Sequence, residues 1–314
     1  MKRCVTTMPL ADLEIPPAFA QAIRTLRGDV GDAWLRDLPV LVAELAARWR
    51  VTIGQPFALS YNYVARAHRE DGTEAVFKIG LWGDELRQEI HALRRYDGDG
   101  ICRLLEADLP AQAMLLERLR PGTMLAVIAD QDDDEATRIA AGVLRRLWRP
   151  VEGSPEGAGL RPLSAWFGAF ARHRREYGRA GPFPDSILTR AETLVPQLLA
   201  SAPREVLLHA DFHHTNILAS DRGPWLAIDP KGMVGDPGYE VGPFVLNPEP
   251  DGPPKPAAVL TRRLDILADE LAYDRSRLRD WAFVYAVLSA CWSAEDEGDG
   301  WQSAIGSAEN LLHA

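Results

Sequence analysis

Residues 209–216 read His-Ala-Asp-Phe-His-His-Thr-Asn, and this stretch decides the fold that we expect. It follows a short apolar run, and its Asp211 and Asn216 stand five positions apart. Asp229 stands thirteen positions further on, at the end of a second apolar run. Phosphoryl transfer uses a carboxylate that accepts or orients the proton of the attacking hydroxyl, and an amide and a second carboxylate that hold Mg²⁺. The stretch therefore has the residue types of a phosphoryl-transfer site.

A site of this kind needs a second element upstream, because kinases bind nucleotide phosphates with a strand lysine that a helical glutamate holds in place. Lys78 stands in the apolar run 75–80, which we predict as a central strand. Its partner must be Glu85 or Glu89 on the following helix. At about 100° per residue, Glu89 lies about 65° from the centre of the apolar face of that helix and Glu85 more than about 100° away. We therefore predict the pair Lys78 and Glu89.

The rest of the chain predicts an α+β fold with two lobes. An amphipathic helix ends near residue 50, and a helix over 83–96 accompanies a set of short strands. After Pro121 and Gly122 nearly every segment is helical. We expect a small antiparallel-sheet lobe with a helical extension over 1–118, a larger helical lobe over 119–314, and a cleft between them. The predicted strands are 56–60, 61–68, 73–80, 101–107 and 112–117.

Composition excludes several classes of protein. The 314 residues carry a formal net charge of -10 without a basic patch, which disfavours nucleic acid as a partner. The longest uncharged apolar stretch, 281–294, is shorter than the roughly 20 residues that a membrane-spanning helix needs. We expect a buried core helix there, no secretory signal at the start, and a cytoplasmic protein. The three cysteines lack metal-site spacing and are expected to be buried.

These motifs resemble those of the aminoglycoside phosphotransferases, and most of all the branch with the streptomycin 6-kinases and hydroxyurea phosphotransferases. The resemblance runs from about residue 31 to the end of the chain. It rests on Lys78, Glu89, the run Leu-Leu-Glu-Arg-Leu-Arg-Pro-Gly at 115–122, the stretch 209–216, and Trp-Leu-Ala-Ile-Asp-Pro-Lys-Gly-Met-Val-Gly-Asp-Pro-Gly-Tyr-Glu at 225–240.

The resemblance implies a protein-kinase-like fold and an enzyme that uses ATP and Mg²⁺ to phosphorylate a hydroxyl of a small molecule. In that case Asp211 is the catalytic base, Asn216 and Asp229 bind the metal ion, and Lys78 binds the phosphates.

The resemblance also implies the nucleotide site. The interlobe hinge would run through Glu117 and Leu119, where the backbone meets the adenine. This sequence departs from protein kinases in the loop 58–63, which has no glycine. Its grip on the phosphates would have to come from backbone N–H groups or from the side chains of Ser60 and Asn62.

Further polar residues have expected supporting roles. We expect His209 to pack behind the catalytic loop and Asp236 to accept backbone N–H bonds from it. Lys231 either meets the γ phosphate or the acceptor, or is a surface lysine. His213 and His214 are expected near the mouth of the substrate site. Carboxylates that could face a polycationic acceptor are Glu240, Glu249, Asp251, Glu295, Asp296 and Glu297.

Other functions stay open at this stage. The acceptor could be a streptomycin-like aminoglycoside, hydroxyurea, or an unknown sugar or amino-alcohol metabolite. A metallohydrolase would instead use the cluster of His209, Asp211, His213 and His214 as metal ligands. A nucleotide-binding scaffold without catalysis is a third possibility, although no catalytic residue type is missing. The sequence does not indicate an oligomeric state.

Overall fold

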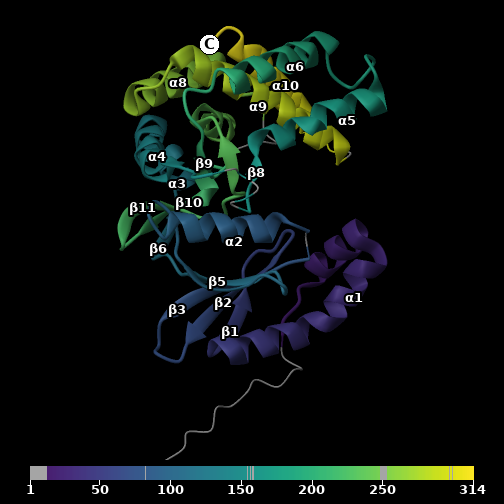
Figure 1. The fold of residues 1–314 in the computed structure, drawn as a ribbon, viewed down its shortest axis with the longest axis vertical. Helices are drawn as coiled ribbons and strands as arrows, with labels where there is room; N and C mark the ends of the chain where they lie inside the picture. The colour runs from purple at the N-terminus through teal and green to yellow at the C-terminus, as the bar shows by residue number, and fades with distance from the viewer. Residues whose placement is uncertain are drawn as a thin grey trace, which may run out of the picture. The chain divides into compact units, whose positions relative to one another are not determined.

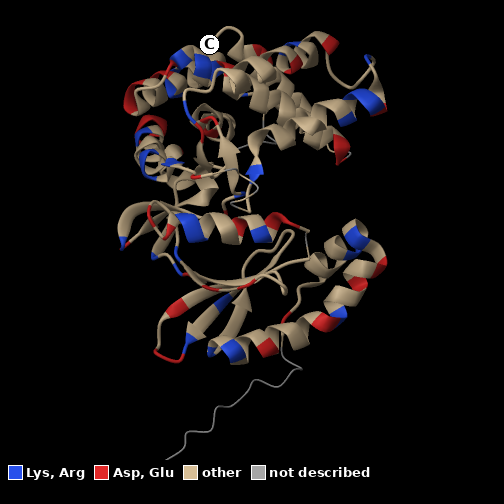
Figure 2. Ribbon diagram, in the orientation of Figure 1, with Lys and Arg blue, Asp and Glu red and all other residues tan. Residues whose placement is uncertain are grey.

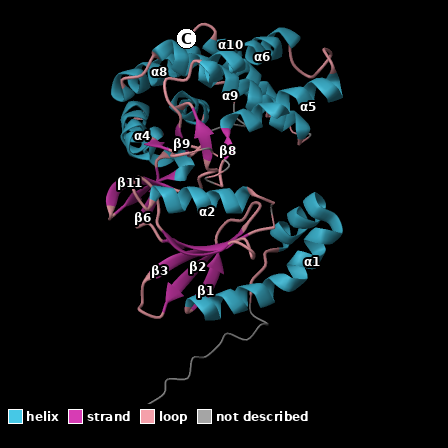
Figure 3. Ribbon diagram, in the orientation of Figure 1, coloured by secondary structure: helices cyan, strands magenta, loops and turns pink. Residues whose placement is uncertain are grey.

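The computed structural model describes residues 13–81, 83–153, 155, 157, 159–247, 253–296, 298 and 300–314. The chain divides into two compact units (Figures 1 and 3). The first unit consists of Met1–Gly98 and Cys102–Arg118, and the second of Asp99–Ile101 and Leu119–Ala314. The short segment Asp99–Ile101 belongs to the second unit because the N–H of Ala227 donates to Gly100 O at 2.9 Å.

The first unit contains the antiparallel sheet that the sequence predicts, in the order β1-β2-β3-β5-β4. The first strand was predicted too late, because residues 56–60 leave the sheet after Pro56 and begin the loop to β2. The elements are α1 (Pro17–Trp49), β1 (Val51–Pro56), β2 (Tyr63–Arg69), β3 (Glu74–Ile79), α2 (Glu85–Tyr96), β4 (Leu104–Asp108) and β5 (Ala113–Glu117).

The two faces of this sheet bury different sets of side chains. Ala65, Phe77 and Leu115 stand opposite one another across β2, β3 and β5 and belong to the hydrophobic core that includes α1. Trp49 of α1 lies 5.8 Å from the Phe77 ring. Successive strand residues point to opposite faces, so Lys78 is directed away from this core. That face carries α2 (Figure 1).

Helix α1 begins earlier than the sequence pattern indicates. Its start at Pro17 uses a proline in the first turn, where the missing N–H would have had no helical partner. Gly28, with φ 52° and ψ -132°, bends the helix. Prolines and glycines within residues 16–31 hide these turns from a search for helical periodicity.

The second unit is largely helical, and α9 (Arg275–Glu295) runs through its core with buried residues on most of its faces. Asp274 caps α9 by accepting the N–H of Arg277 at 2.7 Å. The other helices are α3 (Ala126–Ala129), α4 (Asp133–Leu147), η2 (Leu163–Phe167), α5 (Gly168–Tyr177), α6 (Asp185–Ala200), η3 (His214–Asn216), η4 (Pro237–Glu240), α7 (Val241–Leu246), α8 (Ala257–Leu271) and α10 (Trp301–Leu311).

Two small sheets lie among these helices, with the orders β11-β10-β6 and β7-β9-β12-β8. The apolar runs at 206–208, 217–219 and 225–228 indicate three of their strands, whereas β7, β8 and β12 have only two or three residues and give no sequence signal. Their strands are β6 (Pro121–Met124), β7 (Arg149–Pro150), β8 (Arg161–Pro162), β9 (Val206–Leu208), β10 (Ile217–Ser220), β11 (Gly223–Ala227) and β12 (Met233–Gly235).

Three expectations from composition can be compared with the structure. The apolar stretch 281–294 lies in α9 and is buried in the core, and no described helix is long and apolar enough to cross a membrane. Figure 2 shows basic and acidic residues interspersed along helices such as α1, α2 and α8. Cys102 and Cys291 are free thiols in the protein interior, and Cys4 lies outside the described residues.

Candidate active site

Two short antiparallel pairings in the second unit bring the polar motifs together. Strand β12 pairs with β9, and beyond this ladder the N–H of Lys231 donates to His209 O at 2.8 Å. Strand β11 pairs with β10, and the N–H of Ile228 donates to Asn216 O at 2.9 Å. The first pairing places Lys231 beside the loop that carries Asp211, and the second places Asn216 beside Asp229.

The side chains at this point form a compact charged group. Lys231 Nζ lies 3.5 Å from Asp211 Oδ2 and 3.8 Å from Asp229 Oδ2. The side chains of Asp211, Asp229 and Lys231 are 28%, 37% and 33% exposed, so a ligand can reach all three. Asp229 has φ 62°, a left-handed conformation that aspartate tolerates better than most residues. Lys231 therefore belongs to the same charged group as Asp211 and Asp229 and is not an isolated surface lysine.

Asn216 and His213 continue this group. Asn216 Nδ2 donates to Asp211 O at 3.0 Å and lies 3.2 Å from His213 Nε2. His213 Nε2 also lies 3.5 Å from Asp211 Oδ1, and His213 Nδ1 lies 3.0 Å from Thr215 Oγ1. Burial lowers the pKa of His213. These contacts of Asn216 use Nδ2, which leaves Oδ1 as the atom that could bind a metal ion.

His209 stabilises the loop from behind. The side chain is fully buried, its Nε2 donates to Ile228 O at 2.8 Å, and its Nδ1 accepts the N–H of Asp211 at 3.3 Å. Both ring nitrogens are thus used in the neutral tautomer. Burial lowers the pKa of His209 to about 4, which excludes it as a proton carrier near neutral pH.

The loop that carries Asp211 is held by Glu240 and not by Asp236, the residue expected to hold it. Glu240 does not face an acceptor, because it is fully buried and its two oxygens accept the N–H groups of His209 and Ala210. Burial raises the pKa of Glu240 to about 8. Asp236 does not accept these two N–H groups of the loop.

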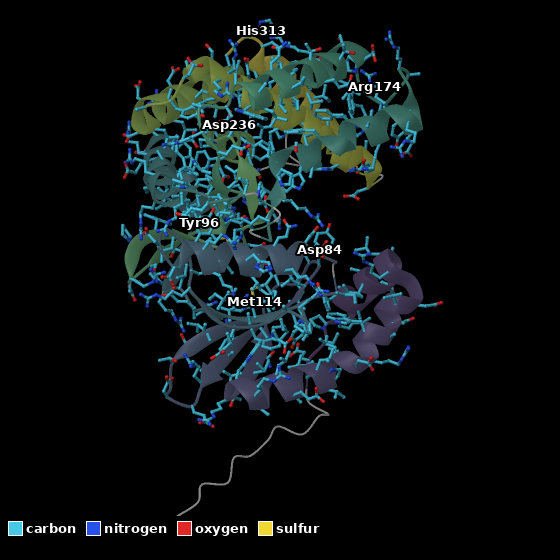
Figure 4. All side chains as sticks on the ribbon, viewed as in Figure 1. Asp84, Tyr96, Met114, Arg174, Asp236 and His313 are labelled. Atoms are coloured by element: carbon cyan, nitrogen blue, oxygen red, sulfur yellow. The ribbon has the colours of Figure 1, made fainter. Side chains whose placement is uncertain are left out.

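Asp236 instead joins η4 to the last helices. It accepts the N–H of Gly238 at 2.8 Å, the hydroxyl of Tyr273 at 2.6 Å, and bonds from Arg277 and Trp281 at 2.7 Å each. Figure 4 labels Asp236 among the packed side chains of the second unit. The carboxylate that holds the loop is therefore Glu240, one helical turn further on.

His214 is not at the mouth of a substrate site. Its ring is fully buried and stacks on Phe244 with centroids 4.1 Å apart. Neither ring nitrogen has a hydrogen-bond partner among the described residues, and burial lowers the pKa to about 2. The metallohydrolase interpretation is therefore wrong, because it needs the ring of His214 as a metal ligand beside the other members of the cluster. In the part of the chain that the structure describes, no three His, Cys, Asp or Glu side chains gather as a metal-binding group.

In the first unit, Lys78 pairs with Glu89 and not with Glu85. Lys78 Nζ lies 2.9 Å and 2.7 Å from the two carboxylate oxygens of Glu89, and both side chains are buried. Lys78 points from β3 toward α2 because of its place in the strand alternation. Glu89 meets it from the buried face of α2.

The loop 57–62 and the end of β5 hold the other expected nucleotide residues. Ser60 is exposed, whereas Asn62 packs on Gly80, where an added Cβ would lie 2.0 Å from Asn62 Oδ1. That oxygen is buried without a hydrogen-bond partner among the described residues. Glu117 Oε2 accepts the N–H of Arg103 at 2.9 Å, and Leu119 is buried in the second unit.

The remaining acidic candidates lose most of their support. Glu295 is taken up by Arg172, whose Nε and Nη2 lie 2.9 Å and 3.0 Å from its two oxygens. Asp296 follows the end of α9 and is exposed. Glu249, Asp251 and Glu297 lie outside the described residues.

Comparison with known proteins identifies the family. The sequence profile of the aminoglycoside/hydroxyurea antibiotic resistance kinases matches residues 48–298. The chain belongs to this kinase family. It is 36% identical over 289 residues to a streptomycin 6-kinase of Streptomyces glaucescens, with 90% of this chain and 92% of that protein covered. It is 35% identical over 288 residues to a hydroxyurea phosphotransferase of Kitasatospora aureofaciens, with 91% and 82% covered.

The kinase also has the fold that the sequence predicts. The crystal structure of choline kinase LicA from Streptococcus pneumoniae matches with a TM-score of 0.61 at 14% identity, covering 88% of this chain and 98% of that one. The resemblance and the α+β, protein-kinase-like fold are thereby confirmed. Membership of this family makes the protein an enzyme, an ATP-dependent phosphotransferase.

Proposed function

We propose that this kinase transfers the γ phosphoryl group of ATP to a hydroxyl of a streptomycin-like aminoglycoside. The observation that carries the proposal is the convergence of Asp211, Asp229 and Lys231, all partly exposed, with the buried Asn216 beside them. The identity of 36% and 35% with a streptomycin 6-kinase and a hydroxyurea phosphotransferase supports an antibiotic as the acceptor.

In this mechanism Asp211 is the catalytic base. Its carboxylate is partly exposed, and the hydrogen bonds of His209 and Glu240 hold its loop in place. It accepts a hydrogen bond from the acceptor hydroxyl and takes its proton as the oxygen attacks the γ phosphorus. Lys231 lies beside it and stabilises the negative charge of the transferred group.

Asn216 and Asp229 fit a magnesium ion, because each offers an oxygen ligand of the kind that Mg²⁺ prefers. Asn216 Nδ2 is bonded to the backbone of Asp211, which orients Oδ1. When bound, Mg²⁺ would neutralise charge on the phosphates. Until then the ammonium of Lys231 offsets part of the negative charge of Asp211 and Asp229.

The residues expected to bind the nucleotide are assigned individually. We assign the phosphates to Lys78, held by Glu89, and the adenine to the backbone at Glu117 and Leu119, with Ser60 and Asn62 as further polar groups of the loop. The first unit is then the nucleotide-phosphate lobe, and the second carries the catalytic loop, the metal ligands and the acceptor site. A cytoplasmic location, where ATP is abundant, suits this reaction.

The experiment that tests the function is ADP release by the purified protein with Mg-ATP. The acceptors are streptomycin, a deoxystreptamine aminoglycoside, hydroxyurea, and simple sugars and amino alcohols. We expect streptomycin to stimulate ADP release, and Asp211→Asn to lower turnover at least about 100-fold with ATP affinity nearly unchanged. If hydroxyurea alone stimulated ADP release, the acceptor would be hydroxyurea and not streptomycin. Turnover that survives in Asp211→Asn would show that Asp211 is not the catalytic base.

A further inference from the structure

Four aromatic rings of the second unit form a closed group, which we call the aromatic cluster. Trp166 of η2 lies 5.1 Å from Trp292 of α9 and 5.9 Å from Tyr239 of η4, measured between ring centroids. Tyr285 of α9 lies 5.9 Å from Tyr239 and 6.4 Å from Trp292. Each ring therefore contacts two others of the cluster.

The aromatic cluster combines a buried ring with accessible ones. Tyr239 is fully buried, whereas Trp166, Tyr285 and Trp292 are partly exposed. The interplanar angles of 65°, 90°, 78° and 79° turn the π faces in more than one direction. In the described part of the chain, arginines stack on rings such as Trp148 and Phe244, but on none of these four. The π faces of the cluster carry no internal cation there.

The aromatic cluster is tied to the catalytic loop. Tyr239 directly precedes Glu240, whose carboxylate holds the N–H groups of His209 and Ala210 next to Asp211. Burial raises the pKa of Tyr285, and the charge of Asp211 raises it further while that of Lys231 lowers it. The ring of Tyr285 thus lies within electrostatic reach of both groups.

In the part of the chain that the structure describes, two carboxylates close in sequence to the cluster are already engaged. Glu240 is buried on the backbone of the catalytic loop, and Glu295, three positions after Trp292, is paired with Arg172 through two bonds. The partly exposed rings of the cluster include Tyr285, which lies within electrostatic reach of Asp211. Aromatic faces attract cations and favour the flat, weakly hydrated guanidinium over the compact, strongly hydrated ammonium.

We propose that the aromatic cluster is a specificity site that binds a guanidinium group of the acceptor through Trp166, Tyr285 and Trp292. This proposal rests on the proposed function and deepens it. Streptomycin bears guanidinium groups on a ring that also carries hydroxyls, whereas deoxystreptamine aminoglycosides bear ammonium groups. The aromatic cluster then explains how this kinase selects the first class over the second.

The test measures binding and turnover separately. Streptomycin affinity is measured by calorimetry on wild type and on Trp292→Leu, Trp166→Leu, Trp292→Phe and Tyr285→Phe, with Trp148→Leu as the control. Trp148 belongs to the same unit but lies outside the cluster and already carries Arg204. We expect Kd and KM for streptomycin to rise about tenfold in the two leucine variants, with KM for ATP unchanged. The phenylalanine variants and Trp148→Leu should stay within about threefold of wild type.

The outcomes separate this proposal from the proposed function. If streptomycin is phosphorylated and the leucine variants bind it as wild type does, the function stands and the aromatic cluster is not its site. If streptomycin is not phosphorylated but binds, and the leucine variants weaken that binding, the function fails and the guanidinium site stands. Absence of streptomycin binding to the wild type overturns the site. Circular dichroism checks that the leucine variants fold. If one does not, the affinities of wild type and Trp292→Phe for the two aminoglycosides are compared instead. Tighter binding of the ammonium-bearing aminoglycoside than of streptomycin would contradict the proposal.

Discussion

Glu240 is the residue on which the geometry of the catalytic loop depends. Both of its oxygens accept backbone N–H groups, and the second of these belongs to Ala210, whose φ of 68° is left-handed. Glu240→Gln places an amide donor against one of these N–H groups. We expect kcat to fall at least about tenfold and stability to fall by about 1–3 kcal/mol, with KM for ATP unchanged. Steady-state kinetics and urea unfolding measure both, with Glu270→Gln as the control, since Glu270 pairs on the surface with Arg145. Equal kinetics in the two variants would contradict the role of Glu240.

Asp229 tests the metal site at the same scale. Asp229→Ala removes one of the two proposed oxygen ligands, so ATP affinity should fall at least about tenfold in the presence of Mg²⁺ and little in its absence. Calorimetric titration of ATP with and without Mg²⁺ measures the difference. Asp221→Ala, an exposed aspartate between β10 and β11, is the matched control. An unchanged affinity in Asp229→Ala would exclude it as a ligand.

At the scale of elements, the β3–α2 pair of Lys78 and Glu89 separates stability from function. Breaking a buried ion pair on one side leaves an uncompensated charge, so Glu89→Gln should cost about 3 kcal/mol. The double variant Lys78→Met with Glu89→Leu removes both charges and should fold about as stably as wild type. We still expect it to lack kinase activity, because the strand lysine that we assign to the phosphates of ATP is gone. Denaturant unfolding and ADP release decide this, with Glu85→Gln as a control. An active double variant would show that the kinase does not need Lys78 to bind the phosphates of ATP.

The elements also show what the sequence could predict. Antiparallel strands with alternating burial and an amphipathic helix fix the direction of Lys78 and Glu89, so pattern analysis finds both. The sequence did not show that Glu240, and not Asp236, holds the catalytic loop, because this depends on β12 and η4, which are too short to show periodicity. The one signal in the sequence was a second carboxylate, Glu240, four positions after Asp236. His214 was misplaced since a histidine in a polar motif gives no sign that its ring stacks inside the core.

For the whole molecule, the buried histidines predict sensitivity to acid. The pKa of His209 falls from its usual 6.5 to about 4, and burial also lowers the pKa of His173. A histidine with a lowered pKa binds its proton more readily in the unfolded chain, so stability falls as the pH drops below about 6.5. Each such group contributes up to about 1.4 kcal/mol per pH unit. Glu240, with its pKa raised to about 8, acts in the opposite direction, since its contribution is lost as the pH rises.

The histidines outnumber this single carboxylate, so we expect a net loss of stability between pH 7 and pH 5. Urea unfolding across this range measures it. His173 lies between the rings of Phe183 and Tyr177, and His173→Phe should flatten the dependence on pH while leaving the stability at pH 8 similar. A variant with the unaltered slope would show that His173 does not titrate with unfolding.

The buried cysteines place one thiol in each unit, Cys102 in the first and Cys291 in the second. Burial raises the pKa of Cys291 to about 12, so a thiol reagent modifies it only after its surroundings open. With Cys4 replaced by serine, the rates at which the two thiols react under native conditions report the opening of each unit separately. Mass spectrometry of the labelled peptides then shows whether the sheet and the helices open as one cooperative structure or two. Nucleotide and antibiotic each reveal which unit they protect, because protection slows the labelling of the thiol that the ligand keeps enclosed.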